Sequence, residues 1–151
     1  MALPALLLGL IGLAPFVGCG LAALGTSAPD AWLDALIGYA ALVLSFAGGV
    51  HWGLVLGEAD PRSPGPRLGL AVVPLVLGWA ALVCAVLVAF WLALAILIVA
   101  YILAIAVEQQ GSTRGLLPPR YLWLRWAFTI AAVAMLTTVL TLRLLGQTIV
   151  F

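Results

Sequence analysis

Four residues far apart in this sequence carry side chains that could do chemistry together. They are His51, which is the only histidine of the chain, and Glu108, Tyr121 and Arg125. An imidazole near a carboxylate, a phenol and a guanidinium could relay protons, bind an anion or hold the head group of a quinone. The interpretation that we favour is structural: Glu108 and Arg125 form an ion pair, and His51 donates to a backbone carbonyl.

Other kinds of chemical site are not predicted. One histidine and one glutamate are fewer ligands than a structural or catalytic metal needs, and the chain has no second histidine to ligate haem. The sequence contains no P-loop or dinucleotide fingerprint and no recognisable pair of nucleophile and base. Cys19 and Cys84 cannot form a disulfide framework, and we expect them to be small buried residues. We therefore expect no metal, no other cofactor and no catalytic residue, in a protein that is not an enzyme.

The composition is that of a membrane protein. Hydrophobic residues make up 66% of the 151 residues and charged residues 7%, whereas a soluble domain carries about 25% charged residues. We therefore expect one polytopic domain over residues 1–151 with the lipid bilayer as its surroundings. No cluster of basic residues could follow a nucleic acid backbone, so we expect no nucleic acid partner.

Five apolar stretches could cross a bilayer, which takes roughly 20 residues each. The fold predicted is an all-α membrane protein, a bundle of five transmembrane helices over about residues 3–25, 31–57, 68–86, 89–109 and 121–146. The division of the long apolar run near residues 86–90 is the weakest boundary, since no Gly, Pro or Asn marks it.

Charge determines the predicted orientation. Five of the six basic residues flank the two loops that share one side of a five-span protein: Arg62, Arg67, Arg114, Arg120 and Arg125. Arginine-rich loops stay in the cytoplasm, so we predict a cytoplasmic N-terminus and a periplasmic C-terminus in the inner membrane of a bacterium. The same topology places His51, Glu108, Tyr121 and Arg125 near the cytoplasmic interface.

The second predicted helix carries a small residue at every fourth position. Small residues let membrane helices approach closely, and we favour packing of this row inside the bundle over docking of a second copy or a partner. The row consists of Ala41, Ser45, Gly49, Gly53 and Gly57.

Aromatic and hydroxyl side chains add two further expectations. Trp52, Trp79 and Trp123 are predicted as interfacial aromatics. The last predicted helix carries threonines that could line a polar conduit, although threonines in membrane helices commonly bond to the backbone. These are Thr129, Thr137, Thr138 and Thr141.

The segment GYAALVLSFAGGVHWG at residues 38–53 resembles the signature of a bacterial membrane-protein family, domain of unknown function 3429 (DUF3429), which has mitochondrial relatives. The similarity continues at Gly78-Trp79, at the acidic residue that closes the fourth helix, here Glu108 where the family has Asp, and at Pro119-x-Tyr121-x-x-Leu124-Arg125-x-x-x-Thr129. Many relatives have Leu in place of Ala47, and some have Arg in place of His51, which counts against a mechanism that requires imidazole. The resemblance implies a five-helix inner-membrane protein and supplies no activity.

Three functions are compatible with these features. We favour a small accessory or assembly subunit that packs through its glycine-rich helix against a larger bioenergetic membrane complex, respiratory or photosynthetic, or against copies of itself. A small transporter or proton-conducting channel would instead use His51, Glu108 and Arg125. A third possibility is a protein that binds a lipid or quinone at the cytoplasmic interface. The direction in which His51 points distinguishes the three.

Overall fold

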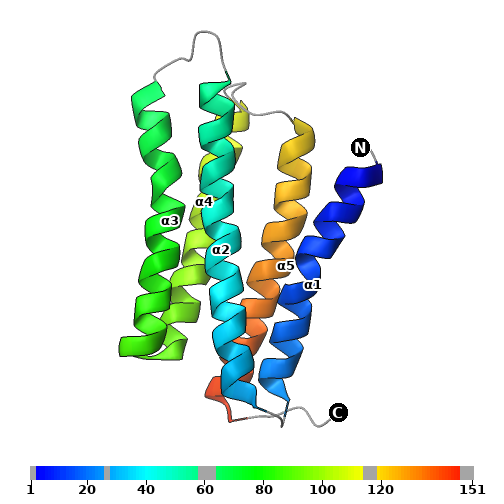
Figure 1. Ribbon diagram of the computed structural model, residues 1–151, viewed down its shortest axis with the longest axis vertical. Helices are drawn as coiled ribbons and strands as arrows, with labels where there is room; N and C mark the ends of the chain where they lie inside the picture. The colour runs from blue at the N-terminus through cyan, green and yellow to red at the C-terminus, as the bar shows by residue number, and fades with distance from the viewer. Residues whose placement is uncertain (1–2, 26–27, 58–63, 114–118, 147–151) are drawn as a thin grey trace.

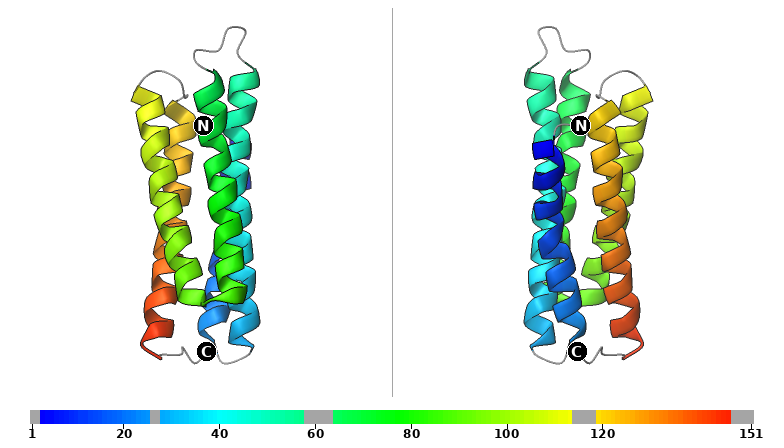
Figure 2. Two further views of the ribbon diagram at one scale, coloured as in Figure 1. Left: turned by 90° about the vertical axis from the view of Figure 1, so that its left-hand side faces the viewer. Right: turned by 90° about the vertical axis from the view of Figure 1, so that its right-hand side faces the viewer.

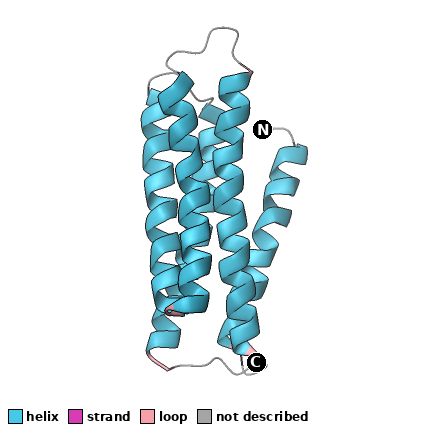
Figure 3. Ribbon diagram, turned by 60° about the vertical axis from the view of Figure 1, so that its left-hand side comes forward, coloured by secondary structure: helices cyan, strands magenta, loops and turns pink. Residues whose placement is uncertain are grey.

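The structure is a computed structural model that describes residues 3–25, 28–57, 64–113 and 119–146. It contains five helices in this part of the chain: α1 (Leu3–Leu24), α2 (Pro29–Leu56), α3 (Pro64–Leu87), α4 (Phe90–Thr113) and α5 (Pro119–Leu144). No strand occurs in the described ranges (Figure 3). The all-α prediction is confirmed, and each helix falls where the hydrophobic pattern places one.

Prolines explain why three helices begin earlier than predicted. Pro29, Pro64 and Pro119 each occupy the first position of a helix. A proline is well tolerated there, because the first backbone N–H groups of a helix have no partner within it. Hydropathy alone starts α3 about four residues too late, because the first turn after Pro64 includes the charged Arg67.

The turn between α3 and α4 consists of Val88 and Ala89. The backbone N–H groups of both residues donate to the Cys84 carbonyl, at 3.0 and 2.9 Å. Two amides therefore share one carbonyl at the end of α3, which closes the helix without a glycine. This explains why residue type did not mark the boundary.

The helices form a closed ring. Each packs against the next along the chain, and α1 packs against α5; α2 also contacts α4 across the ring. α1 begins at the end of the bundle where α2 and α4 end and where α3 and α5 begin, whereas α5 ends at the opposite end (Figure 1). Such an alternation suits a protein that crosses a membrane several times.

Four of the described helices are long and apolar enough to cross a membrane. The spans are Pro29–Leu56, Arg67–Leu87, Phe90–Thr113 and Tyr121–Leu144, and α1 adds the shorter apolar stretch Ile11–Leu24. The prediction of several membrane spans is therefore confirmed. A fifth crossing by α1 stays a prediction.

Aromatic contacts hold α1 to the rest of the bundle. The ring of Phe16 meets those of Tyr39, Tyr101 and Phe128 edge to face, with centroids 5.2, 6.2 and 5.9 Å away. The Tyr39 hydroxyl donates to the Gly12 carbonyl at 2.6 Å, in the turn that Pro15 loosens by removing a backbone donor. The carbonyl that loses its donor to the proline is that of Ile11, so the Tyr39 bond to Gly12 adds a contact from a neighbouring helix next to the interrupted turn.

The close approach between α2 and α3 differs from the one predicted. A Cβ atom at Gly48 would overlap the backbone oxygen of Ala71, and one at Gly78 would lie 3.0 Å from the Ala41 oxygen and 3.2 Å from the Ser45 hydroxyl. Ala41 and Ser45 thus pack inside the bundle, as predicted.

The remaining members of the small-residue row do not pack against another helix. Among the described residues, a Cβ atom at Gly49 or Gly53 would meet no other helix within 4 Å, and one at Gly57 would meet only carbonyl oxygens of α2 itself. The prediction of packing inside the bundle is wrong for these three glycines. The residue of α2 that packs against α3 is instead Gly48, one position before Gly49. An α-helix has about 3.6 residues per turn, so residues spaced four apart do not stay on one face.

We expect Gly48→Ala and Gly53→Ala to have opposite effects on stability. The added methyl group at position 48 forces α2 and α3 apart, and such overpacking costs about 1–3 kcal/mol. The methyl group at position 53 enters open space and gains the higher helix propensity of alanine. Thermal unfolding in a mild detergent measures both, and a Gly48→Ala protein as stable as the parent would contradict the packing described.

Candidate functional site

Three helices bring the predicted polar residues together. α2 supplies His51, α4 supplies Glu108, and α5 supplies Arg125 and Tyr121. All four lie toward the end of the bundle where α2 and α4 end and α5 begins. The α2·α4 contact across the ring and the α4·α5 contact along it allow these side chains to meet.

Glu108 is the centre of this polar cluster. The Arg125 Nε atom donates to both carboxylate oxygens, at 3.0 Å each. His51 Nε2 lies 3.2 Å from Glu108 Oε1, and Tyr121 lies near the same carboxylate. Glu108 is 2% exposed and Arg125 7%. The structure therefore contains the ion pair that we favoured, but His51 bonds to the carboxylate and not to a backbone carbonyl.

Tyr101 of α4 packs against the polar cluster, and this role was not predicted from the sequence. Its ring lies under the Arg125 guanidinium, 5.9 Å from Cζ to the centroid, and its hydroxyl donates to the Ala40 carbonyl at 2.9 Å. A buried aromatic ring attracts a cation and excludes water. Tyr101 thereby links the ion pair of α4 and α5 to the backbone of α2.

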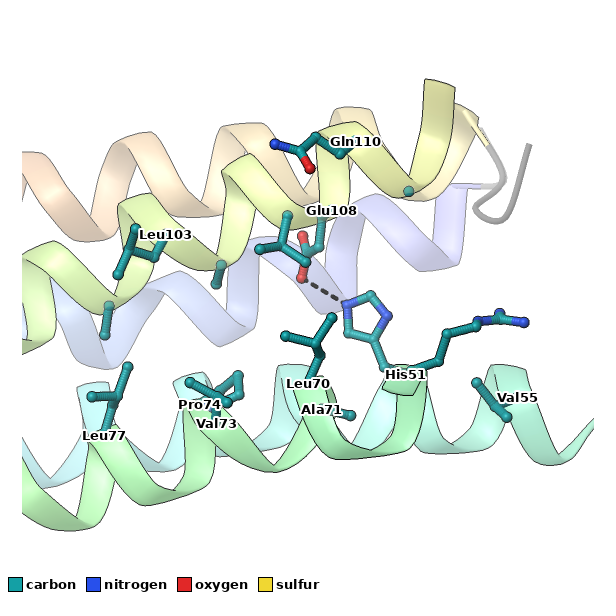
Figure 4. Close-up of a pocket in the computed structure, with 15 residues that line it drawn as sticks. His51, Val55, Leu70, Ala71, Val73, Pro74, Leu77, Leu103, Glu108 and Gln110 are labelled. Carbon is teal, nitrogen blue, oxygen red and sulfur yellow. Dashed lines mark hydrogen bonds and ion pairs between the residues drawn. The ribbon is translucent and has the colours of Figure 1, made fainter. Parts of the chain in front are cut away.

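A groove of about 410 Å³ lies beside the cluster, between α2, α3 and α4. His51 and Glu108 form one polar end of it (Figure 4), with Arg67 and Gln110 also in the lining. The rest of the wall is apolar: Val55 from α2, Leu70, Ala71, Val73, Pro74 and Leu77 from α3, and Ala100, Leu103, Ala104 and Val107 from α4.

The divergence of α3 and α4 produces the groove. The two helices meet at their short turn and spread toward the end that carries the polar cluster (Figure 2). Hydropathy identified both helices, yet it contains no information on the angle between them. The groove was therefore missed in the sequence, although its apolar wall residues lie in the predicted spans.

The three tryptophans all reach the outside of the bundle. Trp52, Trp79 and Trp123 are 43, 64 and 76% exposed. Trp52 and Trp123 are in the parts of α2 and α5 nearest the polar cluster. Trp79 lies about 12 Å in from the end of α3 at about 1.5 Å per residue, which is deeper than the other two. Their place at the membrane interface stays a prediction.

The threonines of α5 do not line a conduit. Thr137, Thr138 and Thr141 are exposed, and Thr138 and Thr141 donate to carbonyls one turn earlier in their own helix, at 2.8 and 2.9 Å. Only Thr129 is buried, at 3% exposure. Beyond the cluster, the described core is filled by apolar side chains that include Leu44, Leu94, Leu97, Leu136 and Val139.

The chemistry of the cluster is hydrogen bonding and charge. Within the described ranges, no three His, Cys, Asp or Glu side chains lie close enough to hold a metal ion together. The imidazole of His51 is partly exposed, at 24%, and lines the groove; Tyr121 is also partly exposed but does not line it. The imidazole can therefore exchange a proton or a hydrogen bond with a molecule bound there.

Comparison with known proteins agrees with the resemblance noted in the sequence. The pattern of the family described as "Protein of unknown function (DUF3429)" matches residues 1–141. The chain belongs to this family. It is also 43% identical over 82 residues to transmembrane protein 69 of Xenopus tropicalis, a match that covers 52% of this chain and 32% of the relative. The matched region is thus about a third of the length of that curated relative. No solved structure matches the chain.

In this DUF3429 protein, we expect Arg125→Ala to be strongly destabilising. The substitution leaves the buried Glu108 carboxylate without its counter-charge, which costs about 3–5 kcal/mol. Adding Glu108→Gln should recover part of the loss, because the unpaired charge has gone. Unfolding in detergent measures the single and double variants.

Asp30→Asn provides the control for that experiment. Asp30 pairs with Arg143 at the other end of the bundle, and the Asp30 side chain is 86% exposed. Exposed pairs contribute only about 0–1 kcal/mol, so this variant should stay close to the parent. Strictly additive losses in Arg125→Ala and Glu108→Gln would show that the two residues do not interact.

Proposed function

We propose that this small integral membrane protein binds an amphipathic molecule from the bilayer, with the apolar part of the ligand in the groove and its polar end at His51 and Glu108. The observation that carries the proposal is the groove of about 410 Å³ with one polar end. Binding sites for small molecules are typically concave, about 300–1,000 Å³ in volume, and mostly apolar with a few polar groups. We propose no chemical step on the ligand.

Access from the side supports a ligand that arrives through the membrane. Leu70 and Val73 of α3 are 54 and 47% exposed, and Leu103 and Val107 of α4 are 53 and 45% exposed. These residues line the groove and also reach the outer surface of the helices. A chain lying between α3 and α4 would therefore stay in contact with the lipid while its end reached the polar cluster.

The same geometry argues against a transporter. A path across the membrane would need polar side chains along its length, whereas the described core beyond the cluster is apolar and the α5 threonines mostly face outward. A groove that has one polar end suits a molecule held at one interface.

The proposal includes the orientation predicted from charge. Arg67 and Arg125 lie toward one end of the bundle, and Arg143 lies at the other. Arg62 and Arg114, together with the Arg120 side chain, are outside the described residues. We propose that α1 also spans the membrane, that the polar cluster faces the cytoplasm and that the membrane is the inner membrane of a bacterium.

Ala104→Trp should abolish ligand binding, because Ala104 lines the groove and an indole would fill it. Ile102→Trp is the matched control on α4, since Ile102 is 50% exposed and does not line the groove. Native mass spectrometry of each purified protein measures the retained small molecules. A molecule retained equally by both variants would place its site elsewhere, and an empty parent protein would contradict the proposal.

A second candidate function is the accessory subunit, which the outer face of α2 favours. Phe46 and Leu56, 73 and 71% exposed, flank the glycines at positions 49 and 53 on this face. A glycine notch between large apolar side chains permits close approach of another membrane helix. The helix could belong to a larger bioenergetic complex or to a second copy of this chain.

For this second function, Gly53→Leu should release a bound partner and leave the monomer folded. The new side chain blocks the notch, but its Cβ meets no atom of the other described helices within 4 Å. Size-exclusion chromatography of complexes extracted from native membranes measures the change. An unaltered assembly, with Gly53→Leu as stable as the parent, would exclude this face as the interface.

A further inference from the structure

We propose that the ligand of the groove is a single-chain amphipathic acid, such as a fatty acid, whose carboxylate pairs with a protonated His51. This inference rests on the proposed function and names the chemistry of the head group. It is based on the hydrogen bonding of the polar cluster, on the way the His51 ring faces and on the size of the groove.

The existing bonds determine what His51 can offer a ligand. Both Glu108 oxygens accept from Arg125 Nε, so the carboxyl group is a pure acceptor and its third partner, His51 Nε2, must carry a hydrogen. The other ring nitrogen, Nδ1, is turned away from Glu108, toward the end of the groove where Val55 lies and away from Pro74 and Leu77 (Figure 4). In a neutral ring Nδ1 carries only a lone pair, whereas in the imidazolium form it is a second donor.

The charges of the polar cluster favour an acidic ligand. Arg125 already compensates Glu108, so protonation of His51 alone would leave a net positive charge beside an apolar wall, which is unfavourable. A bound carboxylate removes that excess. The charges then alternate from Arg125 through Glu108 and His51 to the ligand, and each contact is a charge-assisted hydrogen bond.

The proton balance is simple. A protonated acid that enters from the bilayer transfers its proton to His51 Nδ1 and becomes the carboxylate that accepts from the same nitrogen. A ligand that enters ionised requires His51 to take one proton from water. Either route produces the same complex, and no covalent bond to carbon is made or broken.

Neutral head groups fit the cluster less well. A quinone carbonyl only accepts, so it requires the imidazolium without supplying the compensating charge. A long-chain alcohol can donate to the neutral Nδ1, but this bond lacks the charge that strengthens a hydrogen bond by about twofold. The comparison between an acid and an alcohol of the same chain therefore isolates the proposed interaction.

The groups that face His51 from the neighbouring helices agree with an anionic ligand. Glu108 from α4 bonds to the ring directly, and Arg125 and Tyr121 from α5 act on that carboxylate. Arg67 from α3 also lines the groove and has an interaction of its own. Glu108 is thus the only acidic side chain among the described residues that line the groove, and Arg125 compensates its charge.

The apolar part of the groove suits one chain. Leu70 on α3 lies beside His51, and Pro74 and Leu77 on α3 continue along the groove with Leu103 on α4, away from the polar end (Figure 4). A volume of about 410 Å³ is near the lower limit for small-molecule sites, which run from about 300 to 1,000 Å³. It can hold a head group and part of one chain, but not the two chains of a phospholipid.

The test compares oleic acid, oleyl alcohol and decylubiquinone for binding to the full chain in nanodiscs. Because His51 is the only histidine, the ¹⁵N resonances of histidine-labelled protein report its protonation without assignment. We expect oleic acid to convert the ring to imidazolium. We also expect it to bind about tenfold or more tightly than the alcohol, which corresponds to the binding free energy of one charge-assisted hydrogen bond. Equal affinities for acid and alcohol, or acid binding with a neutral ring, would overturn the inference but leave the proposed function intact.

Substitutions at position 51 provide an independent measurement. His51→Gln should weaken oleic acid at least about tenfold, whereas His51→Arg should restore binding because the cation is permanent. Above the pH at which free acid and free His51 are both deprotonated, parent affinity should fall by about tenfold per pH unit, since binding takes up one proton. In His51→Arg the affinity should be flat in that range. Full affinity in His51→Gln would contradict the inference, and failure of all three ligands to bind the parent would contradict the proposed function as well.

Discussion

The buried contact between Glu108 and Arg125 is the interaction on which one half of the bundle depends, the half where α2 and α4 end and α5 begins. It joins α4 to α5, and through His51 and Tyr101 it connects both to α2. Charges removed from water are costly unless they are paired and fully hydrogen-bonded. The Glu108 carboxylate accepts from Arg125 and lies beside His51, while Arg125 Nη2 is buried without a hydrogen-bond partner among the described residues. The helix ends must therefore keep an arrangement in which the carboxylate stays paired.

Neighbouring helices of the ring do not all pack equally closely, and the groove lies where α3 and α4 separate. Gly48 and Gly78 bring α2 and α3 together at backbone distance, while α3 and α4 separate toward the polar cluster. In lipid no hydrophobic effect drives helices together, so close contact forms where small residues permit it and is absent where large ones stand. Leu70, Val73, Leu103 and Val107 keep the two helices apart and form the apolar wall of the groove.

Sequence reasoning predicted the helices and the polar cluster but not the shape of the cavity. Span length and charge asymmetry predict that His51, Glu108, Tyr121 and Arg125 lie at the same depth in the membrane. The helices that carry them are in contact in the bundle, so side chains at the same depth can meet. Which side of α2 faces α3 depends on the angle at which the helices cross, which a repeat of four residues does not determine. For this reason Gly48 was overlooked in favour of Gly49 and Gly53, and Tyr101 and Gln110 received no role.

The order of the helices around the ring also determines when the charges meet during biosynthesis. α1 to α4 can each pack against the preceding helix as it enters the membrane, but the contact between α1 and α5 closes only when the last helix arrives. Arg125 belongs to that last helix, so the Arg125 guanidinium can pair with the Glu108 carboxylate only after α5 has entered the membrane. The contact that closes the ring and the contact that pairs the buried charges therefore both depend on the last helix.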